Sequence, residues 1–190
     1  MKKTILFSLV PLCMFLFLNS CALMPHKRPS PSLIQWPADV NYMEAVCEIN
    51  ISWSNMQYSG EMSLKLDYPD MLLLEVYGPF GDTVFSIEKN KGYFTLRAGN
   101  DKITDEKRFY DIFKMKIDDF MNDISMKGNG QQNNDGTFSI QRERYRVTYA
   151  LRDLENTICW ISPEGTMRIR FIEVNFDKGQ SIGKGSDRGM

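Results

Sequence analysis

Apolar and polar side chains alternate along the whole length of residues 47–53, Cys-Glu-Ile-Asn-Ile-Ser-Trp. A period of two residues places successive side chains on opposite faces of an extended strand. The same alternation returns in residues 62–68, Met-Ser-Leu-Lys-Leu-Asp-Tyr. The two segments therefore predict antiparallel strands, each with one dry face and one wet face.

Further segments of strand character lie on both sides of a polar middle region. They are residues 71–77, 83–87 and 93–97 before it, and residues 138–141, 145–149, 157–161 and 167–176 after it. In the last of these, the apolar phase flips between Phe171 and Ile172. The flip predicts either a β-bulge or a strand that is buried on both faces.

The middle region has the period of a helix. Thr104 is the expected N-cap, and Asp105 and Glu106 suit the positive end of a helix dipole. The polar loop 128–136 ends the pattern. We therefore predict one amphipathic helical segment over residues 105–126, with an apolar stripe of Phe109, Ile112, Phe113, Ile117, Phe120, Met121 and Ile124.

Strands, one helical segment and then strands again predict an α+β domain whose antiparallel sheet is covered on one side. One helical segment is little cover for so much apolar strand surface. A strongly bent sheet with the helix across its mouth would enclose a cavity, whereas a filled sandwich fits the periodicity equally well. In the first case, the expected lining residues are Phe109, Ile112, Phe113, Ile117 and Phe120.

The start of the chain has the order of a bacterial export signal. Two lysines precede an apolar run over residues 5–18, and small polar residues precede Cys21. Residues 18–21, Leu-Asn-Ser-Cys, resemble the lipobox, whose cysteine receives a diacylglycerol before cleavage. We expect residues 1–20 to be a lipoprotein signal peptide and Cys21 to be lipidated; an ordinary secretory signal is the alternative. In the enteric sorting rule, an Asp directly after the lipidated cysteine indicates the inner membrane. The residue at this position is Ala22, which indicates the outer membrane.

The mature chain divides into three expected parts. Residues 21–37 contain four prolines and are typical of an extended tether. Residues 38–177 form the domain, and residues 178–190 form a disordered tail rich in glycine and polar residues. An oxidising periplasm would permit a disulfide between Cys47 and Cys159, but two buried thiols on separate strands fit the sequence as well.

Composition and motifs exclude several classes of function. The chain has a formal net charge of −1, which disfavours nucleic-acid binding. Its single histidine, His26, lies in the tether. The domain therefore lacks the histidine base of a Ser–His–Asp triad and a histidine for a zinc site. Asp118 and Asp119 are adjacent on a helix and do not face each other as an acid–base pair would. We therefore expect no enzymatic activity, no metal and no cofactor.

One hairpin carries a family resemblance. Residues 70–87 read Asp-Met-Leu-Leu-Leu-Glu-Val-Tyr-Gly-Pro-Phe-Gly-Asp-Thr-Val-Phe-Ser-Ile, a leucine-rich strand, a Pro-apolar-Gly loop and an alternating strand. This hairpin resembles that of the LolB family of outer-membrane lipoprotein receptors, and the family's exposed apolar loop residue falls on Phe80. The order of lipobox, tether, strand pair and helical segment is similar over most of residues 44–176. The loop residue is Phe where the family has Leu, and the C-terminal tail has no counterpart.

The resemblance implies a strongly curved antiparallel sheet, an incomplete barrel, with a helical lid over an apolar cavity that binds acyl chains. It also implies a monomer that accepts lipoproteins from a soluble periplasmic carrier of the LolA type. The implied function is to insert these lipoproteins into the outer membrane from its periplasmic face, with Phe80 touching lipid and with no covalent step. A Phe80 folded back on the core is the alternative for that residue.

Two other functions fit the same sequence. One is a structural or scaffolding envelope lipoprotein whose sheet docks a protein partner. The other is a receptor for a different amphiphile, such as a free lipid or a glycolipid. Co-purified acyl species would distinguish the lipid-binding functions from scaffolding, and the identity of the cargo would distinguish the two lipid-binding functions from each other.

Overall fold

The structure is a computed structural model, and it describes residues 33–152 and 155–179. The expected signal peptide 1–20, the lipidation site Cys21, most of the tether and residues 180–190 of the tail lie outside the described residues. Within them, no helix is long and apolar enough to cross a membrane.

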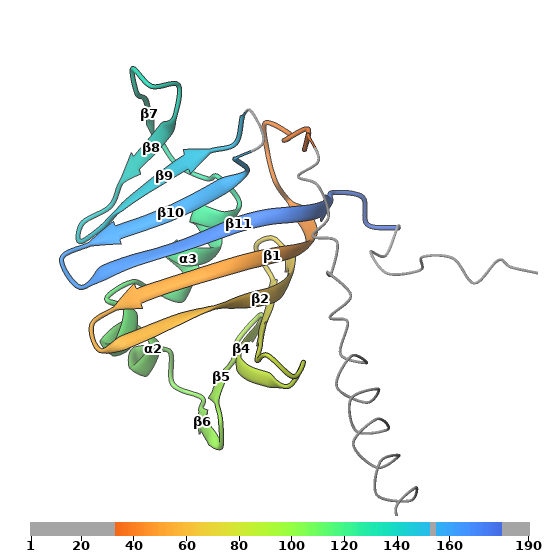
Figure 1. Cartoon of the computed structure of the whole chain (residues 1–190), viewed down its shortest axis with the longest axis vertical. Coiled ribbons are helices and arrows are strands. Elements are labelled where there is room, and N and C mark those ends of the chain that lie inside the picture. The colour runs from red at the N-terminus through yellow and green to blue at the C-terminus, as the bar shows by residue number, and fades with distance from the viewer. Residues whose placement is uncertain (1–32, 153–154, 180–190) are drawn as a thin grey trace, which may run out of the picture. The chain divides into compact units, whose positions relative to one another are not determined.

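One antiparallel sheet dominates the described part of the chain (Figure 1). Its order is β6-β5-β4-β3-β2-β1-β11-β10-β9-β8-β7, so the first and last long strands lie side by side in the middle. The strands β6 and β7 form the two ends, and the sheet is not closed. Its strands are β1 (Tyr42–Trp53), β2 (Met56–Asp67), β3 (Met71–Tyr77), β4 (Thr83–Asn90), β5 (Tyr93–Ala98), β6 (Asp101–Ile103), β7 (Gln131–Gln132), β8 (Phe138–Gln141), β9 (Arg146–Ala150), β10 (Thr157–Ser162) and β11 (Gly165–Asn175).

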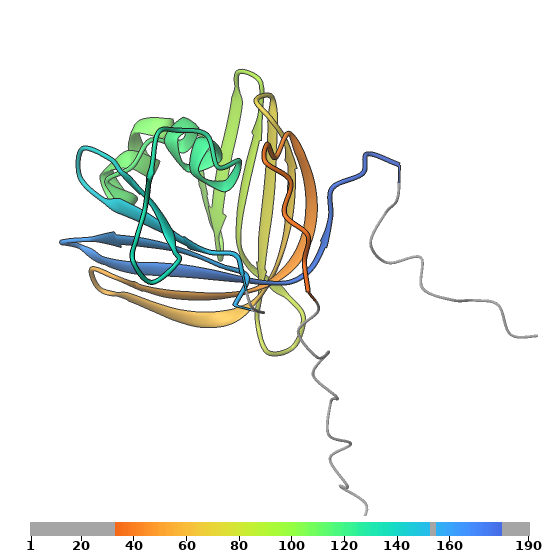
Figure 2. The same cartoon turned by 90° about the horizontal axis from the view of Figure 1, so that it is seen from above.

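Two short helices, α2 (Glu106–Phe113) and α3 (Ile117–Ile124), lie on the concave side of the curved sheet (Figure 2). The predicted α+β class with an antiparallel sheet is therefore confirmed. The two shortest strands, β6 and β7, were not predicted, because segments of two or three mostly polar residues show no usable period.

The alternation in the sequence is the alternation of burial. In β1, the side chains of Cys47, Ile49, Ile51 and Trp53 are buried on the concave side, and the residues between them face outward. The predicted β-bulge is confirmed in β11. Val46 pairs with Glu173 while Cys47 pairs with Phe171, so Ile172 is the extra residue at which the apolar phase flips.

The single predicted helical segment is wrong, because residues 114–116 interrupt it. Lys114 adopts a left-handed conformation with φ 54°, and Lys116 is extended before α3. In one continuous helix, Lys116 would lie on the apolar stripe and Met115 on the polar face. The break reverses this, because Met115 is buried and Lys116 is exposed. Asp105, and not Thr104, caps α2, since its side chain accepts a hydrogen bond from the Lys107 backbone N–H.

The two cysteines are free thiols and lie on opposite faces of the sheet. Cys47 is buried on the concave side, whereas Cys159 lies between the buried residues Ile158 and Trp160 and therefore faces outward. A disulfide between them is excluded in this fold. They do lie on separate strands, but Cys159 is only partly buried.

Packing on the core begins before residue 38. The Trp36 ring lies 5.0 Å from the ring of Phe171 and 5.5 Å from that of Phe176, both edge-on. Its indole Nε1–H donates to Asn156 Oδ1 at 3.1 Å. The last residues of the predicted tether are thus attached to the domain where β11 ends.

Candidate functional site

The helices present aromatic and aliphatic side chains to the concave face. Of the five residues predicted to line a cavity, Phe109, Phe113, Ile117 and Phe120 are buried there together. Ile112 is not, because it lies on the outer side of α2 and is 36% exposed. In a single helix, Ile112 would lie on the predicted apolar stripe. Because α2 has an orientation of its own, Ile112 faces away from the sheet.

Aromatic rings form a continuous cluster between the helices and the sheet. The Phe109 and Phe113 rings of α2 are 4.8 Å apart, and Phe109 lies 6.0 Å from Phe94 of β5. Phe113 lies 6.3 Å from Phe85 and 6.4 Å from Trp53. Most of these rings are buried, so the cluster forms part of the apolar core between the helices and the sheet.

One buried lysine contacts the first turns of both helices. Lys89 of β4 is buried, and its Nζ lies 2.9 Å from Glu106 of α2 and 2.7 Å from Asp118 of α3. Burial acts to lower the pKa of Lys89, but hydrogen bonds and charges from Asp118 and Glu106 raise it overall. The lysine is therefore a cation, and its two partners reach it from exposed positions.

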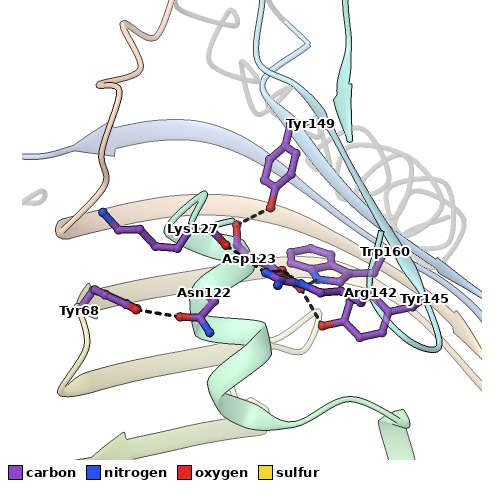
Figure 3. A network of polar contacts seen from close by, with 8 residues as sticks. All are labelled: Tyr68, Asn122, Asp123, Lys127, Arg142, Tyr145, Tyr149 and Trp160. Atoms are coloured by element: carbon purple, nitrogen blue, oxygen red, sulfur yellow. Dashed lines mark hydrogen bonds and ion pairs between the residues drawn. The ribbon is translucent and has the colours of Figure 1, made fainter. Parts of the chain in front are cut away.

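A second, stronger polar contact fixes α3 to the strands on the other side (Figure 3). The Asp123 side chain is fully buried. Its Oδ1 accepts hydrogen bonds from Arg142 Nη2 at 2.6 Å and Nε at 3.0 Å. Its Oδ2 accepts from the Tyr145 hydroxyl at 2.9 Å and from Trp160 Nε1–H at 3.1 Å. The Tyr149 hydroxyl donates to the Asp123 backbone carbonyl at 2.9 Å. Asp123 of α3 therefore accepts hydrogen bonds from the side chains of four residues that lie later in the chain.

Burial raises the pKa of Asp123, and the hydrogen bond and charge of Arg142 act against that rise. Burial also raises the pKa of Tyr145 and of Tyr149, whose hydroxyls therefore stay protonated donors. No pattern in the sequence pointed to Asp123 or Arg142 as a functional or structural site. The available signal was a carboxylate in the last turn of a helix, where the dipole disfavours it, directly beside the apolar residue Ile124.

The opposite side of α3 is also tied down. The Tyr68 hydroxyl, in the turn between β2 and β3, donates to Asn122 Oδ1 at 2.8 Å (Figure 3). Lys127 Nζ, just beyond α3, lies 2.9 Å from Asp39 Oδ1. The helix α3 is thus linked by side chains to both halves of the open sheet.

The loop between β3 and β4 places Phe80 in solvent. The Gly78 N–H donates to the Asp82 carbonyl at 2.7 Å, and the Gly81 N–H donates to the Gly78 carbonyl at 3.0 Å. Gly81 has φ 81°, a conformation that favours glycine. These backbone contacts hold the loop without the Phe80 side chain, which is 96% exposed. Phe80 is therefore not folded back on the core.

Groups that could hold a metal were not found among residues 33–152 and 155–179. His26 lies outside these residues. No protein-family model matches the chain, and no curated protein matches it either.

Proposed function

We propose that the chain is an outer-membrane lipoprotein of the LolB type, which binds the acyl chains of other lipoproteins and inserts them into the outer membrane. In this proposal, the helices act as a lid, and their movement opens an apolar cavity on the concave side of the sheet. No covalent step is involved, and the function is a transfer between binding sites.

The exposure of Phe80 is the observation that supports this proposal best. Leaving a phenylalanine in water forgoes about 1.5–3 kcal/mol of burial free energy. An exposed side chain that stabilises no other part of the fold does not compensate for this loss. An exposed ring at the tip of a self-supporting loop has a use if the loop enters the acyl region of a membrane.

The concave face suits the acyl chains of the cargo. Apolar surface in water costs about 25 cal/mol per Å², so a lipidated protein should move only between dry sites. The aromatic cluster of Phe85, Phe94, Phe109 and Phe113 offers such a site if the cluster parts to admit a chain. A LolA-like soluble carrier would deliver the cargo, and the lipid on Cys21 would hold this chain at the membrane.

Substitution of Phe80 tests the proposal. Phe80→Glu should leave the melting temperature within about 2 °C of wild type, because exposed positions change stability by less than about 0.5 kcal/mol. It should leave acyl-cargo binding intact and sharply lower the incorporation of cargo into vesicles. Phe80→Leu should be tolerated, since leucine keeps an apolar tip.

Leu33→Glu is the matched control, because Leu33 is also an exposed apolar residue but lies outside the loop. Equal transfer by the Phe80→Glu and wild-type proteins would contradict the membrane role of the loop. Absence of any acyl species on the purified protein, measured by mass spectrometry, would favour the scaffolding function instead. A bound free lipid or glycolipid would favour the third function.

A further inference from the structure

Trp53 carries a buried hydrogen-bond donor without an acceptor. It ends β1, its side chain is 1% exposed, and its indole Nε1–H makes no hydrogen bond within the described part of the chain. The other two tryptophans differ. Trp36 donates to Asn156 and Trp160 donates to Asp123, each at 3.1 Å.

An unpaired donor of this kind is costly. Burial of a polar group without a partner loses its hydrogen bonds to water without replacement, and most buried side-chain donors in native proteins are paired. Phenylalanine would provide most of the same apolar surface without that cost. The indole N–H therefore indicates an acceptor from outside the described residues.

The surroundings of Trp53 indicate what kind of acceptor fits. Its ring packs against Phe113 at the end of α2, and Phe113 packs in turn against Phe85 of β4. A ligand at this place must be largely hydrocarbon, with one polar atom that accepts a single hydrogen bond. A carbonyl oxygen on an acyl chain meets both conditions.

Trp53 lies beyond the level of the sheet at which the Phe80 loop begins. In the antiparallel meander of β1 to β4, Tyr77 at the end of β3 pairs with Glu61 of β2, and Glu61 pairs with Glu48 of β1. The Phe80 loop therefore leaves the sheet beside Glu48, and β1 continues past it to Trp53.

The helix above Trp53 is the less firmly held of the two. Within the described residues, α3 is fixed by the buried Asp123 contacts. The helix α2 is held by ring packing and by two polar contacts of partly exposed side chains, Glu106 with Lys89 and Tyr110 with Arg144. Residues 114–116 separate the two helices, and Lys114 is already in a left-handed conformation there. Rotation at this point would lift Phe109 and Phe113 and break the contact of Phe109 with Phe120, while the Asp123 contacts would still hold α3.

This inference rests on the proposed function. We propose that an acyl chain binds beneath α2, between α2 and the strands β1 and β4, and that Trp53 Nε1–H donates a hydrogen bond to its ester carbonyl oxygen. The site would thus recognise the acyl ester as well as the hydrocarbon.

The test compares an ester with an ether. The protein is the full chain with Cys21→Ser, and the probes are a dipalmitoyl-glyceryl cysteine peptide and its dialkyl ether analogue, which has the same peptide but lacks the ester carbonyls. One neutral hydrogen bond of about 1–1.5 kcal/mol corresponds to a preference for the ester of about tenfold. Trp53→Phe should abolish the preference by weakening ester binding, and Trp36→Phe, the matched control, should retain it.

A second measurement needs no substitution at Trp53. The protein is again the Cys21→Ser chain, with Trp53 unchanged. Its Trp53 indole N–H resonance should move downfield on binding of the ester probe and not on binding of the ether probe. Binding of neither probe would overturn the proposed function. Binding of both without an ester preference, or a preference that survives Trp53→Phe, would overturn only the role of Trp53.

Discussion

At the scale of single residues, Asp123 has the largest electrostatic effect on the fold. A buried carboxylate is costly unless it is paired, and here four donor contacts from Arg142, Tyr145 and Trp160 converge on its two oxygens. Removal of such a carboxylate does more than delete its own contacts, because it leaves the donors buried and unpaired.

Asp123→Ala should therefore lower the free energy of unfolding by about 3 kcal/mol, near the lower end of the range for broken buried ion pairs because Arg142 keeps some contact with water. Asp123→Asn should cost less, since an amide oxygen still accepts hydrogen bonds. Urea unfolding at neutral pH measures both values. Asp111→Ala, at an exposed aspartate of α2, is the control and should change stability by less than about 0.5 kcal/mol. A similar small change in Asp123→Ala would show that the contacts in Figure 3 do not stabilise the fold.

The burial of some of these residues could be predicted from the sequence and that of others could not, for a physical reason. The apolar stripe marked Phe109, Phe113 and Phe120, because burial of large apolar side chains repeats with the helix period. The burial of Asp123 could not be predicted, because it depends on Arg142 and Trp160, which lie far along the chain. Pairing between distant residues has no period, and so no local pattern indicates it.

At the scale of elements, the break at residues 114–116 gives the two helices different roles. The helix α3 is tied to both halves of the sheet, whereas α2 is held mainly by apolar contacts. The sequence predicted helical residues throughout this region but not the break. Lysine at position 114 gives no local signal of a left-handed conformation, which glycine or asparagine would have given.

Hydrogen exchange should separate the two helices. We expect the amides of α2 to exchange faster than those of α3, and those of both helices to exchange faster than the amides of β2 and β3 in the sheet. Elements that are held by few polar contacts open locally at lower free energy, and a lid must open to admit a ligand. Protection of α2 equal to that of β2 and β3 would favour a filled sandwich without a moving lid.

At the scale of the whole molecule, the sheet was the predictable part. Alternating burial in β1 and β2 has a strict period of two, and the flip at Ile172 even located the bulge. What lies between the helices and the sheet was not predictable, because periodicity shows which face is apolar and not whether that face encloses space. The orphan N–H of Trp53 was also invisible in the sequence, since any strand-end tryptophan could have found an acceptor.

The two proposed membrane contacts leave the domain at opposite ends. Trp36 packs where β11 ends, near the start of β1, whereas the Phe80 loop follows β3, which runs in the same direction as β1 and ends level with Glu48. The segment from Cys21 to Trp36 could span roughly 50 Å if it were extended, at about 3.3–3.6 Å per residue. A tether of this reach lets a lipid on Cys21 and the Phe80 loop approach the same membrane.

The proposed arrangement at the membrane depends on a lipid at Cys21. Each buried methylene contributes about 0.8 kcal/mol, so several acyl chains on one residue make detachment from a bilayer negligible. Cys21→Ser removes the only atom that the lipobox chemistry can use, and the protein should then appear in the soluble periplasmic fraction. Cys13→Ser, the same change inside the predicted signal peptide, should leave the protein in the membrane fraction. Fractionation with and without detergent measures both variants, and a Cys21→Ser protein that still needs detergent for release would show that the lipobox interpretation is wrong.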